Sequence, residues 1–281
     1  MQPLKEWPLT ARRALVGVFT DIDDTLTTEG AITPDALQAL TALKAAGLYV
    51  IPITGRPIGW CEPFLQSTPQ PAWPVDAMVA ENGAVAFVRS KASPSLAKLY
   101  QQTAATRSAN KVRMQAIAAQ VMAQVPGVHL SQDSPGRETD LAFDYAEFAR
   151  HTPDTVQKVL AILQRAGMQT TVSSIHMHGC FGDFNKWQGA CWIVHELLGR
   201  DLAQELDQWV FVGDSGNDQA MFEHFTHSVG VANIARFAPQ LRHLPRYVTQ
   251  RERGAGFAEV AQAILASRSA PQPGLQRPVR D

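Results

Sequence analysis

Three short polar clusters, each directly after a buried apolar run, constrain this chain most. The run ALVGVFT precedes residues 21–24 (DIDD), LYVIPI precedes 54–56 (TGR), and WVFV precedes 213–218 (GDSGND). Short apolar runs rich in β-branched and aromatic residues are typical of buried strands in a parallel sheet. The carboxyl ends of parallel strands meet at one edge, where ligands bind. We therefore predict that the three clusters converge on one crevice.

Strand and helix patterns alternate in two stretches of the chain, which predicts a parallel sheet covered by helices on both faces. Beyond the three runs above, the first and last stretches carry strand patterns at 77–80 and 227–231 and helix patterns at 34–46, 187–198, 219–225 and 257–266. A middle stretch reads differently, with helix patterns at 108–124 and 153–166, a strand pattern at 141–145 and two strands within 168–180.

These patterns predict an α/β fold: a doubly wound, Rossmann-like parallel-sheet core with an inserted α+β cap domain. The core is predicted to comprise 1–86 and 184–266, and the cap 87–183. An insert of this length is large enough to be a domain in its own right. The tail, 267–281, carries three prolines and no apolar period, so we predict that it is disordered.

The composition excludes several classes of protein. The chain has 281 residues, 45% hydrophobic and 18% charged, with a net charge of -1, as in ordinary globular proteins. It lacks the basic runs of nucleic-acid binders and any apolar run of about 18 residues that would span a membrane. Three scattered cysteines favour neither a disulfide framework nor a zinc site, and fit a reducing cytoplasm.

The predicted crevice gathers several carboxylates, which repel one another unless a cation lies between them. Mg²⁺ prefers oxygen ligands, takes one or two carboxylates and leaves positions for water and a phosphate. We choose Asp21 and Asp214 as its ligands. Asp218 then either ligates the metal through water or orients Lys186, the lysine that we assign to the site. Lys44 is the alternative, but it lies inside a helix pattern.

A carboxylate nucleophile next to a second carboxylate suits phosphoryl transfer. Asp21 can attack phosphorus and form an acyl phosphate that water later cleaves. Asp23 lies two residues on, on the same side of an extended segment, and can move the proton. The phosphoryl oxygens need donors and cations, which Thr54, Gly55 and Lys186 would supply.

The motifs DIDDTL, TGR, an isolated lysine before a helix, and GDSGND, in this order, resemble the four motifs of the haloacid-dehalogenase (HAD) superfamily over most of residues 14–265. The insert between the second and third motifs resembles subfamily IIB. That group includes Cof-type sugar phosphatases, sucrose-phosphate phosphatase, mannosyl-3-phosphoglycerate phosphatase and eukaryotic phosphomannomutase.

The resemblance implies a role for each motif residue. Asp21 is the nucleophile and Asp23 the acid/base; Thr54 and Lys186 bind phosphate. Mg²⁺ is held by Asp21, Asp214 and the backbone carbonyl of Asp23. Around the metal, Asn217 is assigned to the phosphate and Asp218 to the ion. The implied substrate is a small phosphorylated metabolite, either a sugar phosphate or a phosphoglycerate-linked sugar.

Other functions remain open at this point. A phosphomutase would share the nucleophile and the metal, and a non-catalytic phosphate-binding scaffold would keep the pocket, although such a scaffold is expected to have lost one of the aspartates. A dehalogenase would not need Asp23 as a proton donor. An EF-hand is excluded, because Leu26 and Ile32 stand where Gly and Glu are required. Monomer and homodimer are both left open.

Several residues outside the motifs are candidates for substrate contacts. Arg56 either binds substrate or pairs with an acid, and Asn82 is either a turn residue or a contact near the site. His176 and His178 are two residues apart in a predicted strand, so both lie on the same face of it. This placement fits a surface or interface, a metal site, or a substrate contact from the cap. A polar loop contains Arg137, Glu138 and Asp140. This loop is either solvated or binds a hydroxyl or carboxylate of the substrate.

Overall fold

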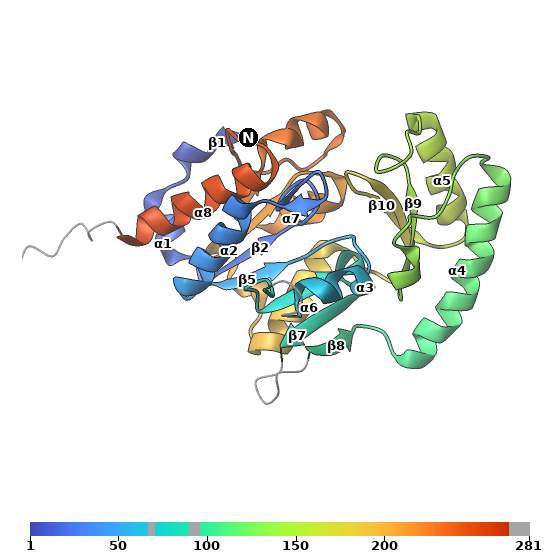
Figure 1. The fold of residues 1–281 in the computed structure, drawn as a ribbon, viewed down its shortest axis with the longest axis horizontal. Helices are drawn as coiled ribbons and strands as arrows, with labels where there is room; N and C mark the ends of the chain where they lie inside the picture. Colours follow the sequence, from blue (N-terminus) through green and yellow to red (C-terminus); the bar gives the residue numbers. More distant parts are fainter. Residues whose placement is uncertain (67–70, 90–95, 270–281) are drawn as a thin grey trace, which may run out of the picture.

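A six-stranded parallel sheet forms the centre of the computed structural model, which describes residues 1–66, 71–89 and 96–269 (Figure 1). The predicted strands at 14–20, 48–53, 209–212 and 227–231 all lie in this sheet, and the predicted fold class is confirmed. In order across the sheet, the strands are β1 (Gln2–Pro3), β14 (Tyr247–Val248), β13 (His227–Gly230), β12 (Trp209–Gly213), β2 (Gly17–Thr20) and β5 (Tyr49–Pro52).

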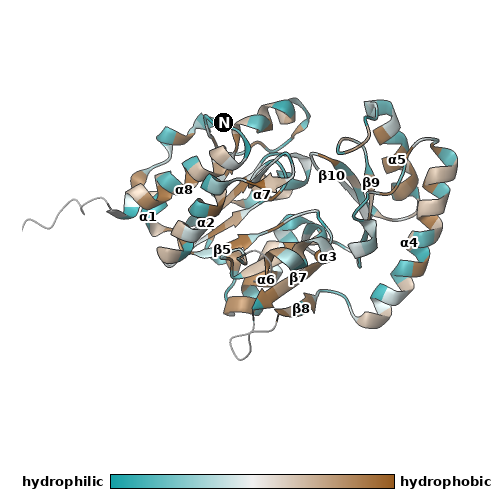
Figure 2. Ribbon diagram, viewed as in Figure 1, coloured by the Kyte–Doolittle hydropathy of each residue, from teal (hydrophilic) through white to brown (hydrophobic). Residues whose placement is uncertain are grey.

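Successive residues of the central strands point to opposite faces of the sheet. Both faces are buried because helices cover each of them. Val18 and Val210 pack with α1 (Leu9–Ala14), α2 (Pro34–Ala45) and α8 (Arg253–Ser269). Phe19 and Phe211 pack on the other face with α6 (Lys186–Leu198) and α7 (Gln219–His224). Figure 2 shows the resulting apolar strands between two layers of amphipathic helices. A short helix, α3 (Ile58–Cys61), follows β5.

An antiparallel hairpin extends this core at the β5 edge. A parallel bridge joins Ile53 to Val79 in β6 (Ala77–Ala80), and β6 pairs with β7 (Val85–Arg89), which pairs with β8 (Leu96–Tyr100). The sequence patterns did not predict β7 and β8. Phe87 and Leu96 pack against the core cluster, so the predicted boundary at 86/87 falls inside a hairpin of the core side. A division near residue 103, just before α4, fits this packing better.

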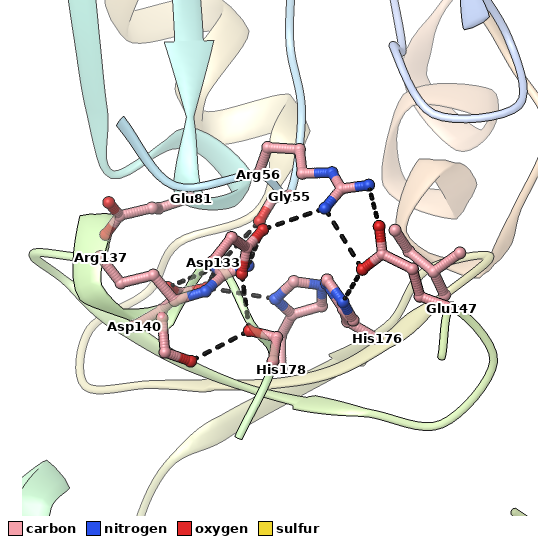
Figure 3. Close-up of polar contacts among 12 residues, drawn as sticks. Gly55, Arg56, Glu81, Asp133, Arg137, Asp140, Glu147, His176 and His178 are labelled. Atoms are coloured by element: carbon pink, nitrogen blue, oxygen red, sulfur yellow. Dashed lines mark hydrogen bonds and ion pairs between the residues drawn. The ribbon is translucent and has the colours of Figure 1, made fainter. Parts of the chain in front are cut away.

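The inserted cap is a three-stranded antiparallel sheet with two helices on one face. Its strands lie in the order β10 (Gln169–Val172), β11 (His176–Cys180), β9 (Asp140–Asp144), and its helices are α4 (Ala104–Gln124) and α5 (Pro153–Arg165). Phe143 and Met177 pack beneath the helices. Because side chains alternate along a strand, the flanking His176 and His178 face the other way, toward the core (Figure 3).

The remaining elements are short. A small hairpin, β3 (Thr27–Thr28) with β4 (Ala31–Ile32), follows the first aspartate cluster. The 3-10 helices span Leu4–Glu6, Glu62–Phe64, Glu81–Gly83, Ser134–Gly136, Leu202–Gln204, Leu206–Gln208, Gly216–Asp218, Ala232–Arg236 and Ala238–Gln240. Helix α8 continues to Ser269, so the prediction of disorder is wrong for residues 267–269, and residues 270–281 of the predicted tail lie outside the described residues. Within the described part of the chain, the helices are too short or too polar to cross a membrane.

Candidate active site

The three motif clusters meet at the carboxyl edge of the sheet because β12, β2 and β5 are neighbours. The backbone N–H of Asp21 donates to the carbonyl of Val212 at 2.8 Å, which ties the end of β2 to β12. Carboxylate oxygens of Asp21, Asp214 and Asp218 all lie within 4.8 Å of one another, and all three residues are buried. The structure thus brings together the acids that the sequence predicted to converge.

Lys186 points into this cluster from the first turn of α6. Asn185 caps the helix by accepting a hydrogen bond from the N–H of Gln188. The Nζ of Lys186 lies 2.5 Å from Asp21 Oδ1 and 2.7 Å from Asp218 Oδ1. Burial lowers the pKa of Lys186, but the two carboxylates outweigh burial, so its pKa is raised and the amine is charged. The alternative, Lys44, pairs with Asp76 at 2.7 Å elsewhere.

The acid cluster fits a divalent cation. Burial raises the pKa of Asp21 to about 8, even though Lys186 lowers it. Burial and the nearby Asp21 raise the pKa of Asp214 well above its usual value. Asp214 Oδ1 is buried and has no hydrogen-bond partner among the described residues. A buried, unpaired carboxylate oxygen beside a second carboxylate is costly, and oxygen ligands of this kind are those that Mg²⁺ prefers.

Asp218 has no free carboxylate oxygen. Its Oδ1 accepts from Lys186, and its Oδ2 accepts from the backbone N–H groups of Asp214 at 2.8 Å and Ser215 at 3.0 Å. Of the two roles left open by the sequence, orienting Lys186 agrees with these contacts better than ligating a metal. Asp218 also fixes the loop that carries Asp214.

Asn233 is a site residue that the sequence analysis missed. Its Nδ2 donates to Asp214 Oδ2 at 2.9 Å and to the carbonyl of Asp24 at 3.0 Å. Its Oδ1 accepts from the N–H of Arg253 at 2.9 Å. Asn233 follows β13, so it is a fourth polar residue just beyond the carboxyl end of a strand. That position is the signal by which the sequence could have revealed it.

Arg56 pairs with acids from both parts of the molecule, and Figure 3 shows the two from the cap, Asp133 and Glu147. Its Nε and Nη2 donate to the carboxylate of Asp23, the latter at 2.9 Å. From the cap, Glu147 Oε1 lies 2.7 Å from Nη2 and Asp133 Oδ2 lies 3.1 Å from Nη1. Of the two readings of Arg56, the acid pair is the one observed. Burial lowers the pKa of Arg56, but the carboxylates of Asp23 and Glu147 raise it by more, so the guanidinium stays charged.

A cavity of about 10 Å³ lies beside Asp21. It is lined by Asp21, Asp23, Gly55, Arg56, Ser173, Ser174, Ile175, His176, His178 and Asn217. This volume holds about one water molecule. Asn217 donates from Nδ2 to Asn82 Oδ1 at 2.9 Å, so Asn82 supports a cavity residue without lining the cavity. Thr54, the first residue of the TGR motif, is buried, and its hydroxyl accepts a hydrogen bond from the N–H of Arg56 at 3.0 Å.

The two cap histidines reach this cavity. His176 Nε2 lies 2.8 Å from Glu147 Oε2, and His178 Nδ1 lies 3.2 Å from Asp140 Oδ2. Neither histidine belongs to a cluster that could hold a metal within the described chain. Both side chains are buried, so the predicted surface position is wrong, and the interface and the substrate contact remain as hypotheses for both residues.

The polar loop before β9 is docked on the core. Arg137 and Asp140 are buried, and Arg137 Nη1 donates to the carbonyl of Gly55 at 2.9 Å and to Asp140 at 2.9 Å. The reading of this loop as solvated is therefore wrong for these two residues. Because Arg137 contacts the TGR motif and pairs with the acid that holds His178, the loop fixes the cap over the cavity.

Glu81 ties the core to this same loop. It is buried, with a φ of 50° in the left-handed region. Its carboxylate accepts the N–H groups of Ile58 at 3.1 Å, Glu138 at 3.1 Å and Thr139 at 2.6 Å, and also the Thr139 hydroxyl. Burial, followed by the charge of Asp140, raises the pKa of Glu81 to about 7.

This raised pKa predicts that the contribution of Glu81 to the free energy of unfolding falls as pH rises. The pKa of about 7 exceeds the ordinary 4.5, so the folded form binds the proton more tightly than the unfolded chain. The contribution is complete below the ordinary pKa and is lost as pH rises through the folded value. Glu81→Gln removes it. Between about pH 5 and about pH 8, we expect wild type to lose on the order of 2 kcal/mol relative to Glu81→Gln in urea unfolding. Parallel pH profiles of the two proteins would contradict the assignment.

Comparison with known proteins agrees with this geometry. A family model described as haloacid dehalogenase-like hydrolase matches residues 18–174. The chain belongs to the haloacid dehalogenase-like hydrolase family. The phosphoglycolate phosphatase of Methanothermobacter thermautotrophicus is 26% identical over 253 residues, 88% of this chain and 98% of the relative.

Solved structures share the fold. The sucrose-phosphatase of Synechocystis sp. PCC6803, solved with sucrose and phosphate, has a TM-score of 0.64 at 15% identity, covering 90% of this chain and 98% of its own. A sugar phosphatase of HAD subclass IIB has a TM-score of 0.59 at 17% identity, covering 88% and 96%. The predicted family and the prediction that the chain is a hydrolytic enzyme are confirmed, and the chain shares the fold of a subclass IIB enzyme.

Proposed function

We propose that this HAD hydrolase is a magnesium-dependent phosphomonoesterase that acts on a small phosphorylated metabolite through an aspartyl-phosphate on Asp21. One observation carries the proposal. The buried carboxylate of Asp21 lines the cavity at the sheet edge, with the Lys186 cation at 2.5 Å and the carboxylate of Asp214, whose Oδ1 has no partner among the described residues, within 4.8 Å. A nucleophile, a cation for phosphate and a place for a metal thus meet at one point.

The chemistry proceeds in two balanced steps. Asp21 attacks phosphorus, the bond from phosphorus to the ester oxygen breaks, and the leaving oxygen takes a proton from Asp23. Asp23 then accepts a proton from water, whose oxygen attacks phosphorus, so that the acyl phosphate bond breaks and Asp21 and inorganic phosphate are released. Lys186 stabilises the charge on the phosphoryl oxygens, and Thr54, Gly55 and Asn217 supply hydrogen-bond donors nearby.

Asp21, Asp214 and the backbone carbonyl of Asp23 are the groups that would hold Mg²⁺. When bound, the ion neutralises charge that develops on the phosphoryl group. Asn233 and Asp218 fix the orientation of the Asp214 side chain and of its loop through the hydrogen bonds described above.

The cap must move to admit substrate. The cavity beside Asp21 has room for about one water molecule, and the carboxylate of Asp23 is held by Arg56. Movement of the cap would separate Arg56 from Glu147 and Asp133, which lie on cap segments. Closure afterwards would exclude water and hold the leaving group.

The relatives support the substrate class. One is named for phosphoglycolate, another was solved with sucrose and phosphate, and a third is called a sugar phosphatase. We propose a sugar phosphate or a phosphoglycerate-linked sugar. The cysteines Cys61, Cys180 and Cys191 are all free, which supports a reducing compartment such as the cytoplasm.

A phosphate-release screen tests the proposal. The purified chain is incubated with Mg²⁺ and a panel of sugar phosphates, phosphoglycerates and 2-phosphoglycolate, without any bisphosphate. We expect inorganic phosphate from at least one class of substrate, and none after chelation. Release of no phosphate from any member would overturn the proposed function. Isomerisation of a sugar phosphate only when a bisphosphate is added would identify a mutase instead.

A further inference from the structure

His178 carries a polar atom that has no partner in the described part of the chain and that faces the reaction cavity. The side chain is 3% exposed, and its Nε2 accepts or donates no hydrogen bond there. His178 lines the same cavity as Asp21, Gly55 and Asn217. Its companion His176, by contrast, has its Nε2 engaged by Glu147. A buried, unpaired ring nitrogen is costly unless a ligand supplies the missing partner.

The surroundings of His178 determine which kind of partner fits. Its Nδ1 lies 3.2 Å from Asp140 Oδ2, and Asp140 is itself held by Arg137 at 2.9 Å. A carboxylate only accepts, so Nδ1 carries the proton. Burial, then the charges of Arg137 and His176, lower the pKa of His178 well below its usual value, so the ring is neutral. The free Nε2 is therefore a hydrogen-bond acceptor.

Gly55 brings this acceptor close to the phosphate site. A Cβ added at Gly55 would lie 3.0 Å from both Cε1 and Nε2 of His178 and 3.3 Å from Nδ2 of Asn217. The imidazole ring therefore rests against the backbone of the TGR motif (Figure 3). His178 and Asp21 line the same small cavity, so a substrate group that pairs with Nε2 would lie close to the phosphate ester.

We propose that His178 is a specificity-determining residue whose Nε2 accepts a hydrogen bond from a substrate hydroxyl on the carbon next to the phosphate ester. This inference rests on the proposed function and narrows its substrate class to phosphate esters with a neighbouring hydroxyl. An ionised phosphoryl group has no hydrogen to donate, whereas a hydroxyl of the leaving group has one, so we assign the donor to that hydroxyl. A carboxylate in that place, as in 2-phosphoglycolate, is disfavoured, because its oxygens and Nε2 of His178 are all hydrogen-bond acceptors.

Two esters that differ only in hydroxyl groups test the proposal. Glycerol 3-phosphate and propyl phosphate share one carbon chain. A site built to bind a hydroxyl rejects the analogue that lacks it, so we expect wild type to prefer glycerol 3-phosphate in kcat/KM by roughly ten-fold or more. His178→Asn keeps a donor toward Asp140 but has no group at the Nε2 position, so this ratio should fall to near one. His178→Gln places an amide oxygen near that position and should keep part of the preference.

His176→Asn is the matched control, because the Nε2 of His176 is already engaged; we expect it to keep the wild-type ratio. Thermal unfolding confirms that each variant is folded. A wild-type ratio near one overturns the proposal without any variant. If His178→Asn lowers kcat/KM equally for both esters, the proposal is also overturned, since His178 would then act on a step common to all substrates. Failure to hydrolyse either ester while other phosphates are hydrolysed overturns it too. Only the absence of all phosphate release in the screen would refute the proposed function itself.

Discussion

Replacement of Asp21 by asparagine is expected to reduce phosphate release by on the order of 10⁴-fold or more, as for other enzymes that lose their nucleophile. An amide does not attack phosphorus, but it has the size of the carboxylate. The fold should persist, because Lys186 keeps its ion pair with Asp218 at 2.7 Å and the repulsion among Asp21, Asp214 and Asp218 is relieved. Turnover of 4-nitrophenyl phosphate and the melting temperature measure the two expectations.

Asp24→Asn is the control for this experiment. Asp24 is adjacent to the site, but its carboxylate pairs with Arg253 at 3.0 Å and is not assigned to the chemistry. We expect its activity to fall by less than about ten-fold, since a partly exposed ion pair contributes little. If Asp21→Asn retains turnover comparable with Asp24→Asn, the nucleophile is another residue.

The site could be predicted from the sequence wherever a local pattern coincided with a topological rule. Thr33 and Pro34 predict the start of a helix, and α2 begins at Pro34. Each of the three polar clusters at 21–24, 54–56 and 213–218 follows a strand, and parallel strands present their carboxyl ends at one edge. These two facts are enough to predict that Asp21 and Asp214 lie together, although 193 positions separate them in the sequence.

The contacts between core and cap could not be predicted in this way. Arg56 meets Glu147 across 91 positions, and Glu81 meets Thr139 across 58. These pairings depend on how the cap docks, and no periodicity records that. Glu81 precedes Asn82, and nothing in this part of the sequence indicates that its carboxylate holds the cap loop through Glu138 and Thr139. The hairpin strand β8 was missed for a related reason: its residues are only partly buried, so its apolar pattern is weak, and pairing with β7 decides its conformation.

Asn233 shows the same limit beside Asp214. Its position after a strand makes it a candidate, but asparagine there is most often a turn residue, and the position alone does not identify Asp214 as its partner. The structure shows that it holds Asp214 Oδ2 at 2.9 Å, which leaves Oδ1 as the free oxygen of that carboxylate.

The free oxygen of Asp214 predicts that Mg²⁺ reverses the stability order of wild type and Asp214→Asn. Without the ion, burial and Asp21 raise the pKa of Asp214 well above normal, so the charged form is costly and the neutral variant should melt at an equal or higher temperature. Saturating Mg²⁺ stabilises only the protein that binds it, by about 3 kcal/mol at a hundred-fold excess over Kd, which corresponds to several degrees in melting temperature.

Wild type should therefore melt above Asp214→Asn once Mg²⁺ is present, and a chelator should restore the original order. Phosphate release by the variant should fall by roughly 10²-fold or more, because the charge on the phosphoryl group is no longer neutralised. The thermal readout does not depend on turnover, so it tests the metal site even if no substrate has been found. An identical shift with Mg²⁺ in both proteins would mean that the ion binds elsewhere. In that case the crowding of Asp21, Asp214 and Asp218 would be balanced by Lys186 alone, and the role assigned to Asp214 would be lost.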